Sequence, residues 1–324
     1  IINKSISIFS LSDNTNKEIT LENENLIIKQ RYYLFNDRRF LSILLMLIGS
    51  VAISFNGLVL RNIDLADNWT IIFYRAFSFS FAIFLYLFFK YGKNVFIKIF
   101  QIRIYGLLGG LVLGISNICF ILSITSTSVA NTIFTISLIP FITAILSLLI
   151  LKEKLAKITI YTMLGAFFGV LIMFYGSLQI GVLFGNILAL FTAISFSIFT
   201  IILRINKNID MMPCLLLSGI MAMALSSFQK MGSLPISNQD LFLCFLLGGI
   251  MSGFVNCCFV FATRYLVAAE ATLFFFIEIA LSPFWVWLFL NEIIMIETLI
   301  GGVIILISIL LRSIYFRLEK SKVN

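Results

Sequence analysis

The sequence contains no histidine and few charged residues, and both features exclude classes of protein. Without histidine the chain cannot carry a Ser-His-Asp triad, an HExxH zinc site or a His-ligated haem. It has no G-x-x-x-x-G-K-[ST] run, so it carries no P-loop of its own. Charged residues make up only 12% of the 324 residues, against about 25% in a soluble domain. We therefore expect no enzyme activity, no metal site and no cofactor.

What the chain does have is apolar surface. Hydrophobic residues make up 60% of it and the mean hydropathy is +1.08, whereas a soluble domain is about 45–50% apolar. The composition predicts a protein that crosses the lipid bilayer several times. The net charge of +8 then reflects basic loops at the membrane rather than nucleic-acid binding. The five cysteines lie in apolar stretches and are expected as small core residues.

Apolar stretches begin after a polar segment, residues 1–40, which we expect to be a cytoplasmic tail. Each stretch is long enough to cross a hydrocarbon core of about 30 Å. The ten predicted spans are 41–60, 70–90, 104–123, 128–151, 158–175, 181–203, 212–229, 241–262, 268–290 and 297–316.

Lys and Arg near the predicted spans predict the orientation. They concentrate in the even-numbered gaps and beside the two tails, whereas the odd-numbered gaps hold only Arg61 and Lys230. Because positive charge favours the cytoplasmic side, both termini are predicted to be cytoplasmic, with residues 318–324 as a second short tail. Heavy use of Ile, Asn, Lys and Phe indicates an AT-rich genome, and we take a bacterial inner membrane, which is a plasma membrane, as the expected location.

An internal repeat relates the two halves of the chain. A shift of 139 residues aligns 107–120 with 246–259, and eight of the 14 positions are identical. We therefore expect two homologous five-helix repeats, 41–176 and 181–317. Because five is odd, the second repeat enters the membrane from the opposite side. Inverted repeats are typical of alternating-access transporters, with the substrate site at the repeat interface; a passive channel is the alternative.

Short motifs in both halves resemble the EamA-type transporters of the drug/metabolite transporter superfamily. In the second half these are A-A-E-A-T-L-F-F-F-I-E-I (268–279) and W-L-F-L-N-E (287–292). In the first half they are S-V-A-N-T-I-F-T-I-S-L-I-P (128–140) and L-K-E (151–153), and F-Y-R-A-F (73–77) matches the family's Arg. The resemblance implies spans one to four and six to nine around a central cavity. It also implies that spans five and ten lie at the edge, where a homodimer contact can form.

The chain departs from the family pattern in three places. Ile279 stands where the family has Pro, and Pro283 follows four residues later. Lys152 and Asn291 replace the closing Gly of the two copies. These departures leave open where the ninth span is interrupted, whereas Pro140 is expected to interrupt the fourth.

Three ionisable residues inside the predicted spans are candidates for binding substrate or a coupling proton: Arg75, Glu270 and Glu278. A charge at the bilayer centre costs at least about 2.5–3.5 kcal/mol unless it is paired or hydrated. On an uninterrupted helix Glu278 lies about 12 Å beyond Glu270, and both can face the same broad side. The alternatives are a helix-to-helix contact or, for Arg75 and Glu270, reach to water.

Polar and aromatic residues complete the candidates. Asn117 and Asn256 are repeat mates that can bond substrate or a neighbouring helix, and Asn131 is the repeat mate of Glu270. Trp287 can stack on a substrate or belong to an aromatic belt at the membrane surface. The span glycines and Glu153 are expected to serve packing and helix capping, respectively.

The sequence predicts a secondary transporter of small polar metabolites, with amino acids first. Its partners would be a small-molecule substrate and the lipid bilayer, without nucleic acid. Proton coupling through Glu270 or Glu278 fits, and analogy to the family favours efflux. The alternatives are an exporter of lipophilic cations or drugs, a membrane enzyme and a passive channel.

Overall fold

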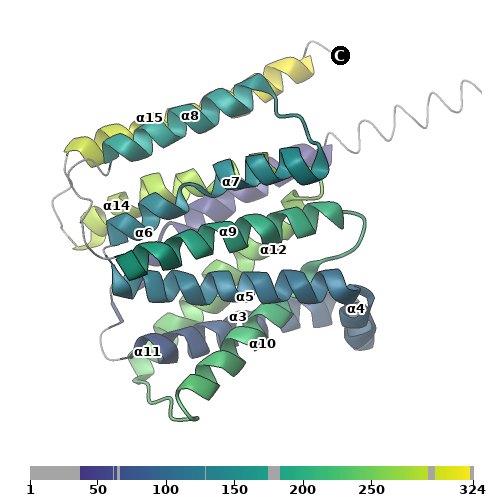
Figure 1. The fold of residues 1–324 in the computed structure, drawn as a ribbon, viewed down its shortest axis with the longest axis vertical. Coiled ribbons are helices and arrows are strands. Elements are labelled where there is room, and N and C mark those ends of the chain that lie inside the picture. Colours follow the sequence, from purple (N-terminus) through teal and green to yellow (C-terminus); the bar gives the residue numbers. More distant parts are fainter. Residues whose placement is uncertain are drawn as a thin grey trace, which may run out of the picture.

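The computed structural model describes residues 37–60, 62–63, 66–127, 129–173, 183–290 and 296–321. Over these residues the chain is helical and has no strand (Figure 1). Nearly all of the predicted N-terminal tail lies outside them, as do Asn291 and Glu292.

Helices make up most of the described part of each range predicted as a span. Helix residues 37–53 precede the labelled elements, which are α2 (Asn56–Leu60), α3 (Asn68–Tyr91), η1 (Gly92–Asn94), α4 (Val95–Gln101), α5 (Arg103–Ser126), α6 (Val129–Ile136), α7 (Ile139–Leu146), η2 (Ser147–Leu151), α8 (Lys157–Met173), α9 (Leu183–Ile205), α10 (Met212–Gln229), α11 (Asn238–Phe245), η3 (Leu246–Ser252), α12 (Gly253–Ala262), α13 (Ala268–Leu273), α14 (Phe275–Leu290) and α15 (Ile296–Ser321).

Within the described residues, eight helices are long and apolar enough to cross a membrane, and α8 is a shorter apolar helix. The helix α15 covers the tenth predicted range. The prediction of an all-helical membrane protein is therefore confirmed at this level. The count of ten spans and the cytoplasmic location of the termini stay predictions.

Local sequence explains where several helices begin and end. Asp67 caps α3 by accepting hydrogen bonds from the Trp69 amide (3.2 Å) and the Thr70 hydroxyl (2.6 Å). Gly92, with a φ of 55°, follows the last turn of α3. Pro213 lies in the first turn of α10, where a missing amide hydrogen costs nothing.

The fourth and ninth predicted spans are both interrupted. Ser137 and Leu138 separate α6 from α7, and Pro140 lies in the first turn of α7. In the ninth span the interruption is at Phe274, between α13 and α14, whereas Pro283 lies inside α14. The interruption of the fourth span is therefore confirmed, and that of the ninth comes well before the displaced proline.

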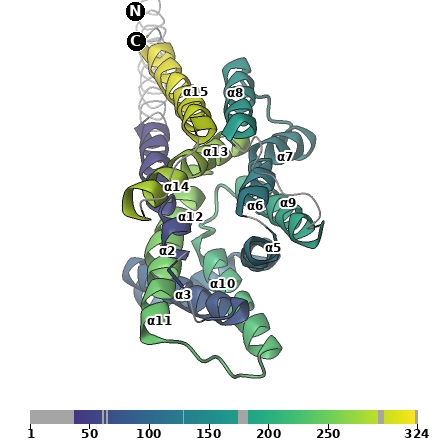
Figure 2. The same cartoon turned by 90° about the vertical axis from the view of Figure 1, so that its left-hand side faces the viewer.

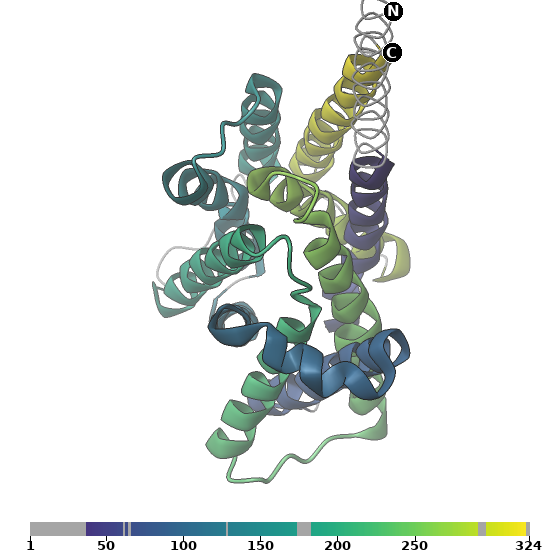
Figure 3. The same ribbon diagram turned by 90° about the vertical axis from the view of Figure 1, so that its right-hand side faces the viewer.

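The two halves of the chain interleave instead of forming separate bundles. Helix α3 packs on α10, α5 packs on both α9 and α10, and α6 and α7 pack on α9. Helices α8 and α15 pack on one another at one edge (Figure 2). In Figure 1 and Figure 3 the start of the first helix and the end of α15 lie toward the same end of the molecule.

Glycines set how closely the α8–α15 pair approaches. A Cβ atom on Gly169 would lie 2.7 Å from the carbonyl oxygen of Gly301 and 2.8 Å from a side-chain carbon of Ile305. Such distances are too short for carbon, so only glycine allows this approach. The packing role expected for the glycines of the third and eighth spans is seen at Gly110, where a Cβ atom would lie 2.7 Å from the Leu217 Cβ and 3.0 Å from the Cys214 carbonyl oxygen.

Candidate functional site

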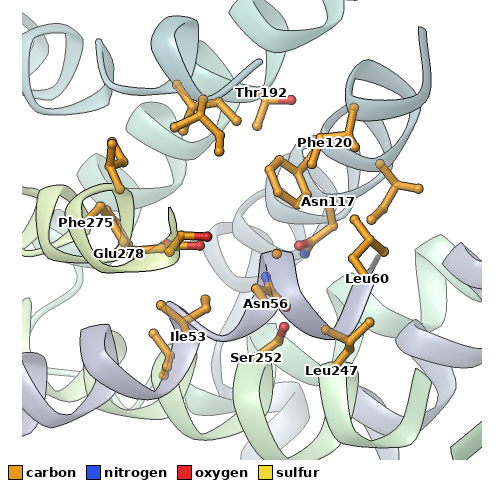
Figure 4. A pocket seen from close by; sticks show the side chains of 18 of the residues that line it. Ile53, Asn56, Leu60, Asn117, Phe120, Thr192, Leu247, Ser252, Phe275 and Glu278 are labelled. Atoms are coloured by element: carbon orange, nitrogen blue, oxygen red, sulfur yellow. The ribbon is translucent and has the colours of Figure 1, made fainter. Parts of the chain in front are cut away.

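A cavity of about 700 Å³ lies between helices of both halves. It is lined by the first helix with α2, by α3, α5, α6, α7 and α9, and by η3, α12 and α14, with single residues from α8 and α15. Figure 4 shows it from close by. Both repeats therefore contribute to the wall of this cavity, and its role as the substrate site stays a prediction.

The cavity reaches one end of the molecule. Helix α3 contributes Asn68, Ile71 and Arg75 from its first turns, and α5 contributes residues between Ser116 and Thr125, from its second half. Loop residues between α2 and α3 also line it. At the other end of these helices, none of the described residues lines the cavity. We call the two ends the cavity end and the closed end.

Arg75 faces this cavity and is held by the second half of the chain. Its Nη2 donates to the Ser252 hydroxyl at 3.1 Å, and its guanidinium carbon lies 5.7 Å from the centre of the Phe120 ring. Gly248 in η3 packs so closely on the Arg75 backbone that a Cβ atom there would overlap the Arg75 carbonyl. Because Gly248 lacks a side chain, η3 can pack directly on the Arg75 backbone, and this contact fixes the position of Arg75 on α3.

Glu278 lies in the first turn of α14 and lines the same cavity. Its side chain is half-buried and, among the described residues, has no hydrogen bond or direct ion pair. It lies close enough to Arg75 for the two charges to interact electrostatically. An unpaired carboxylate in a cavity is free to bind a cationic group or a proton.

Asparagine side chains add neutral hydrogen-bonding groups. Figure 4 shows the Asn117 amide and the Glu278 carboxylate pointing toward the same space, with Asn56 beside them. Asn256 also lines the cavity, and its Nδ2 donates to the Ser252 carbonyl at 2.8 Å. The Oδ1 atom of Asn56 is buried and has no hydrogen-bond partner in the described structure. These amides can orient a polar ligand between the two charges.

The structure places Glu270 and Asn131 away from the cavity lining. Glu270 is 4% exposed and forms ion pairs with Arg39 (2.9 Å) and Arg312 at the closed end. The interruption at Phe274 separates Glu270 from Glu278, so the expectation of one helix that presents both carboxylates to one side is wrong. Asn131 is buried, and its Nδ2 donates to the Thr127 hydroxyl at 3.2 Å.

Part of the cavity wall consists of residues that the sequence did not indicate. Phe196, Phe259 and Phe275 meet with ring centroids 5.1–5.4 Å apart, and all three line the cavity. Asn56 could have been found as a lone amide in an apolar stretch. The aromatic group could not, because the sequence has 35 phenylalanines. Trp287 also lines the cavity, which keeps the stacking alternative for it.

Among the described residues, no three His, Cys, Asp or Glu side chains gather in a way that could hold a metal ion. The chemistry of the cavity is therefore that of one cation, one carboxylate, several amides and a phenylalanine wall. This set, together with the hydroxyl groups of the lining, can bind a small polar molecule.

Comparison with known proteins identifies the family. A solved structure titled "Crystal structure of protein" superimposes with a TM-score of 0.70 at 13% identity, covering 86% of this chain and 99% of that one. No curated protein matches the chain in sequence. The sequence model of the EamA-like transporter family matches residues 40–175 and 183–314. The chain therefore belongs to the EamA-like transporter family of the drug/metabolite transporter superfamily.

Proposed function

We propose that this protein is a secondary transporter of amino acids or related zwitterions, working by alternating access. The observation that carries the proposal is the placement of Arg75 and Glu278 on one cavity. A zwitterion offers a carboxylate to the guanidinium and an ammonium group to the carboxylate. The volume of about 700 Å³ falls in the usual range for small-molecule sites.

Different parts of the cavity wall can contact the polar and the apolar parts of such a substrate. Asn117 and Asn256 lie on the same cavity as the two charges and can complete the hydrogen bonds of the ammonium and carboxylate groups. The apolar side of a substrate can pack on Phe196, Phe259 and Phe275.

Counterflow in proteoliposomes tests this function. Vesicles loaded with a mixed amino-acid pool should take up labelled substrate saturably. Glu278→Gln and Arg75→Gln should each raise KM about 10–100-fold, because a hydrogen bond to a charged group contributes about 1.5–3 kcal/mol. Lys207→Gln, which changes an exposed charge away from the cavity, is the control and should match the parent. No exchange of any amino acid by folded protein would refute the substrate class.

Proton coupling is proposed through Glu278, the carboxylate that lines the cavity. Uptake by the parent should respond to an imposed pH gradient, whereas Glu278→Gln should transport without that response. A variant that keeps the full response would place the coupling group elsewhere. Efflux is the proposed direction, and opposite gradients in vesicles of known orientation would measure it.

Export of lipophilic cations is the second candidate, because the phenylalanine wall and Glu278 also suit an apolar cation. Arg75 distinguishes the two candidates. It repels a cation but binds a zwitterion's carboxylate, so Arg75→Gln should enhance transport of tetraphenylphosphonium and weaken that of amino acids. If Arg75→Gln abolished transport of both tetraphenylphosphonium and amino acids, neither repulsion of a cation nor binding of a carboxylate could be assigned to Arg75.

A further inference from the structure

At the closed end, the chain carries three carboxylates that join its two halves. Glu153 of the first half pairs with Arg204 of the second (2.6 Å), and Asp210 of the second pairs with Lys90 of the first (2.7 Å). The third carboxylate, Glu270 of the second half, pairs with Arg39 at the start of the first helix. All lie beyond the parts of their helices that line the cavity. Ion pairs between the halves thus concentrate where the cavity is shut.

Two of these carboxylates act on one turn, residues 263–267, which connects α12 to α13. Arg204 donates from Nη1 to the carbonyl oxygens of Thr263 (3.0 Å) and Arg264 (3.1 Å) while its Nε donates to Glu153. The second Glu153 oxygen lies 3.5 Å from the Ala268 amide nitrogen. Glu153 and Arg204 together therefore hold both ends of this turn.

Asp210 binds one side chain of the same turn, that of Arg264. Arg264 donates from Nη2 to Asp210 at 2.8 Å, and Lys90 and Tyr91 donate to the other carboxylate oxygen. Burial alone would raise the pKa of Asp210, but bonds from Lys90, Tyr91 and the Met212 amide, with the Arg264 charge, outweigh it. They hold that pKa below the ordinary value. The carboxylate thus stays charged across the physiological range.

The backbone around Glu153 is built to aim this side chain. Lys152 adopts the left-handed conformation, with a φ of 54°, and ends η2. The reversal brings the Glu153 amide to within 3.3 Å of the Ser147 carbonyl, and the Ser147 hydroxyl donates to Glu153 at 3.1 Å. A residue with a Cβ atom rarely adopts this conformation. The left-handed backbone of Lys152 therefore costs conformational energy, and this strain lies next to the side chain that it positions, Glu153.

The cavity end has a weaker connection. There Lys230 pairs with Asp67 at 3.1 Å, and the two side chains are 31% and 43% exposed. Arg204 and Glu153 are only 12% and 20% exposed. Exposed pairs contribute little, whereas partly buried charges that also bond backbone groups contribute more. The stronger of these two connections is at the closed end.

From this arrangement we propose that Glu153 and Arg204 are positioning residues for transport. They hold the turn 263–267 against the first half of the chain and so keep this end of the protein closed. Release of their contacts to Thr263, Arg264 and Ala268 opens the cavity toward this end. The proposal rests on the proposed alternating access but does not depend on which solute is carried.

Hydrogen–deuterium exchange of the full chain in lipid nanodiscs tests this role without any substrate. In Glu153→Gln, amides of 263–273 should exchange about tenfold faster than in the parent, with a smaller rise in 147–157 and at the end of α9. Lys154→Gln, an exposed charge in the same loop, is the matched control and should behave as the parent. Arg204→Lys, which keeps the charge but loses the fork that reaches both carbonyls, should give an intermediate effect.

Two results would overturn the proposal. One is unchanged exchange of 263–273 in Glu153→Gln. The other is a uniform rise over the whole chain, including α8 and α15, which indicates general destabilisation. Because this readout needs no solute, failure to find amino-acid exchange would refute the proposed substrate and leave the exchange result valid. In active vesicles, Glu153→Gln should alter the turnover rate. In the Glu153→Gln background, Arg75→Gln should still raise KM as it does in the parent.

Discussion

The substitution Glu270→Gln is expected to damage folding rather than the cavity. The Glu270 side chain is 5% exposed and pairs with Arg312, which is 9% exposed, and with Arg39, which is 27% exposed. Arg312 also donates to the Thr159 hydroxyl at 3.2 Å, but has no other acidic partner in the part of the chain that the structure describes. Removing the carboxylate therefore leaves Arg312 buried without a counter-charge.

The expected cost is about 3–5 kcal/mol, the usual cost of removing one partner from a buried ion pair. The lower end applies if the amide oxygen of the substituted side chain still accepts one hydrogen bond. For a chain of this length the loss corresponds to a fall in Tm of roughly 6–10 °C, at about 2 °C per kcal/mol. The assay is thermal unfolding of purified protein in detergent, followed by native tryptophan fluorescence.

Glu278→Gln is the matched control, because it makes the same chemical change on a cavity wall without a direct partner among the described residues. It should shift Tm by less than about 2 °C. The double variant Glu270→Gln/Arg312→Met should recover part of the loss, because the unpaired cation is gone. A Tm for Glu270→Gln within about 2 °C of the parent would refute the reasoning that this carboxylate neutralises the buried Arg312.

Three further variants test local features. Lys152→Gly should raise stability by about 1 kcal/mol, because glycine adopts the left-handed conformation without a Cβ penalty; an unchanged or lower Tm would contradict this. Gly169→Leu should separate α8 from α15 at Gly301 and cost about 1–3 kcal/mol, measured by Tm and by monodispersity on size exclusion. The stability that Asp210 contributes is present above the ordinary pKa of 3.8 and lost as pH falls through its lower folded-state pKa. Asp210→Asn should therefore flatten the loss of Tm below about pH 4.

The sequence predicted the helices well because a membrane span leaves a direct record in hydropathy. It also predicted Arg75 and Glu278 as neighbours of a cavity, because an intramembrane charge needs water or a partner. The repeat identified Asn117 and Asn256 as mates that could face a cavity or bond a neighbouring helix, and both line the cavity. The lining residues agree with these placements. Their roles in binding stay proposals.

The sequence could not predict contacts between distant segments. Nothing in the A-A-E-A motif indicates that Glu270 meets Arg39 and Arg312, which lie at opposite ends of the chain. Nor did Pro283 predict the interruption at Phe274, because a proline can remain inside a helix when neighbouring groups satisfy the freed carbonyl. Lys152 departs from a family glycine, and only the backbone geometry shows that this lysine adopts the left-handed conformation.

The pairing of α8 with α15 has a consequence for how the protein is made. The two helices are far apart in the sequence, yet the glycine contact at Gly169 and Gly301 joins them. Because synthesis runs from the N-terminus, α8 and Glu270 are made before α15, which carries Gly301 and Arg312. Both contacts therefore form only after α15 has been made. A chain that stops before α15 thus leaves Gly169 without the helix that packs on it and Glu270 without one of its two counter-charges.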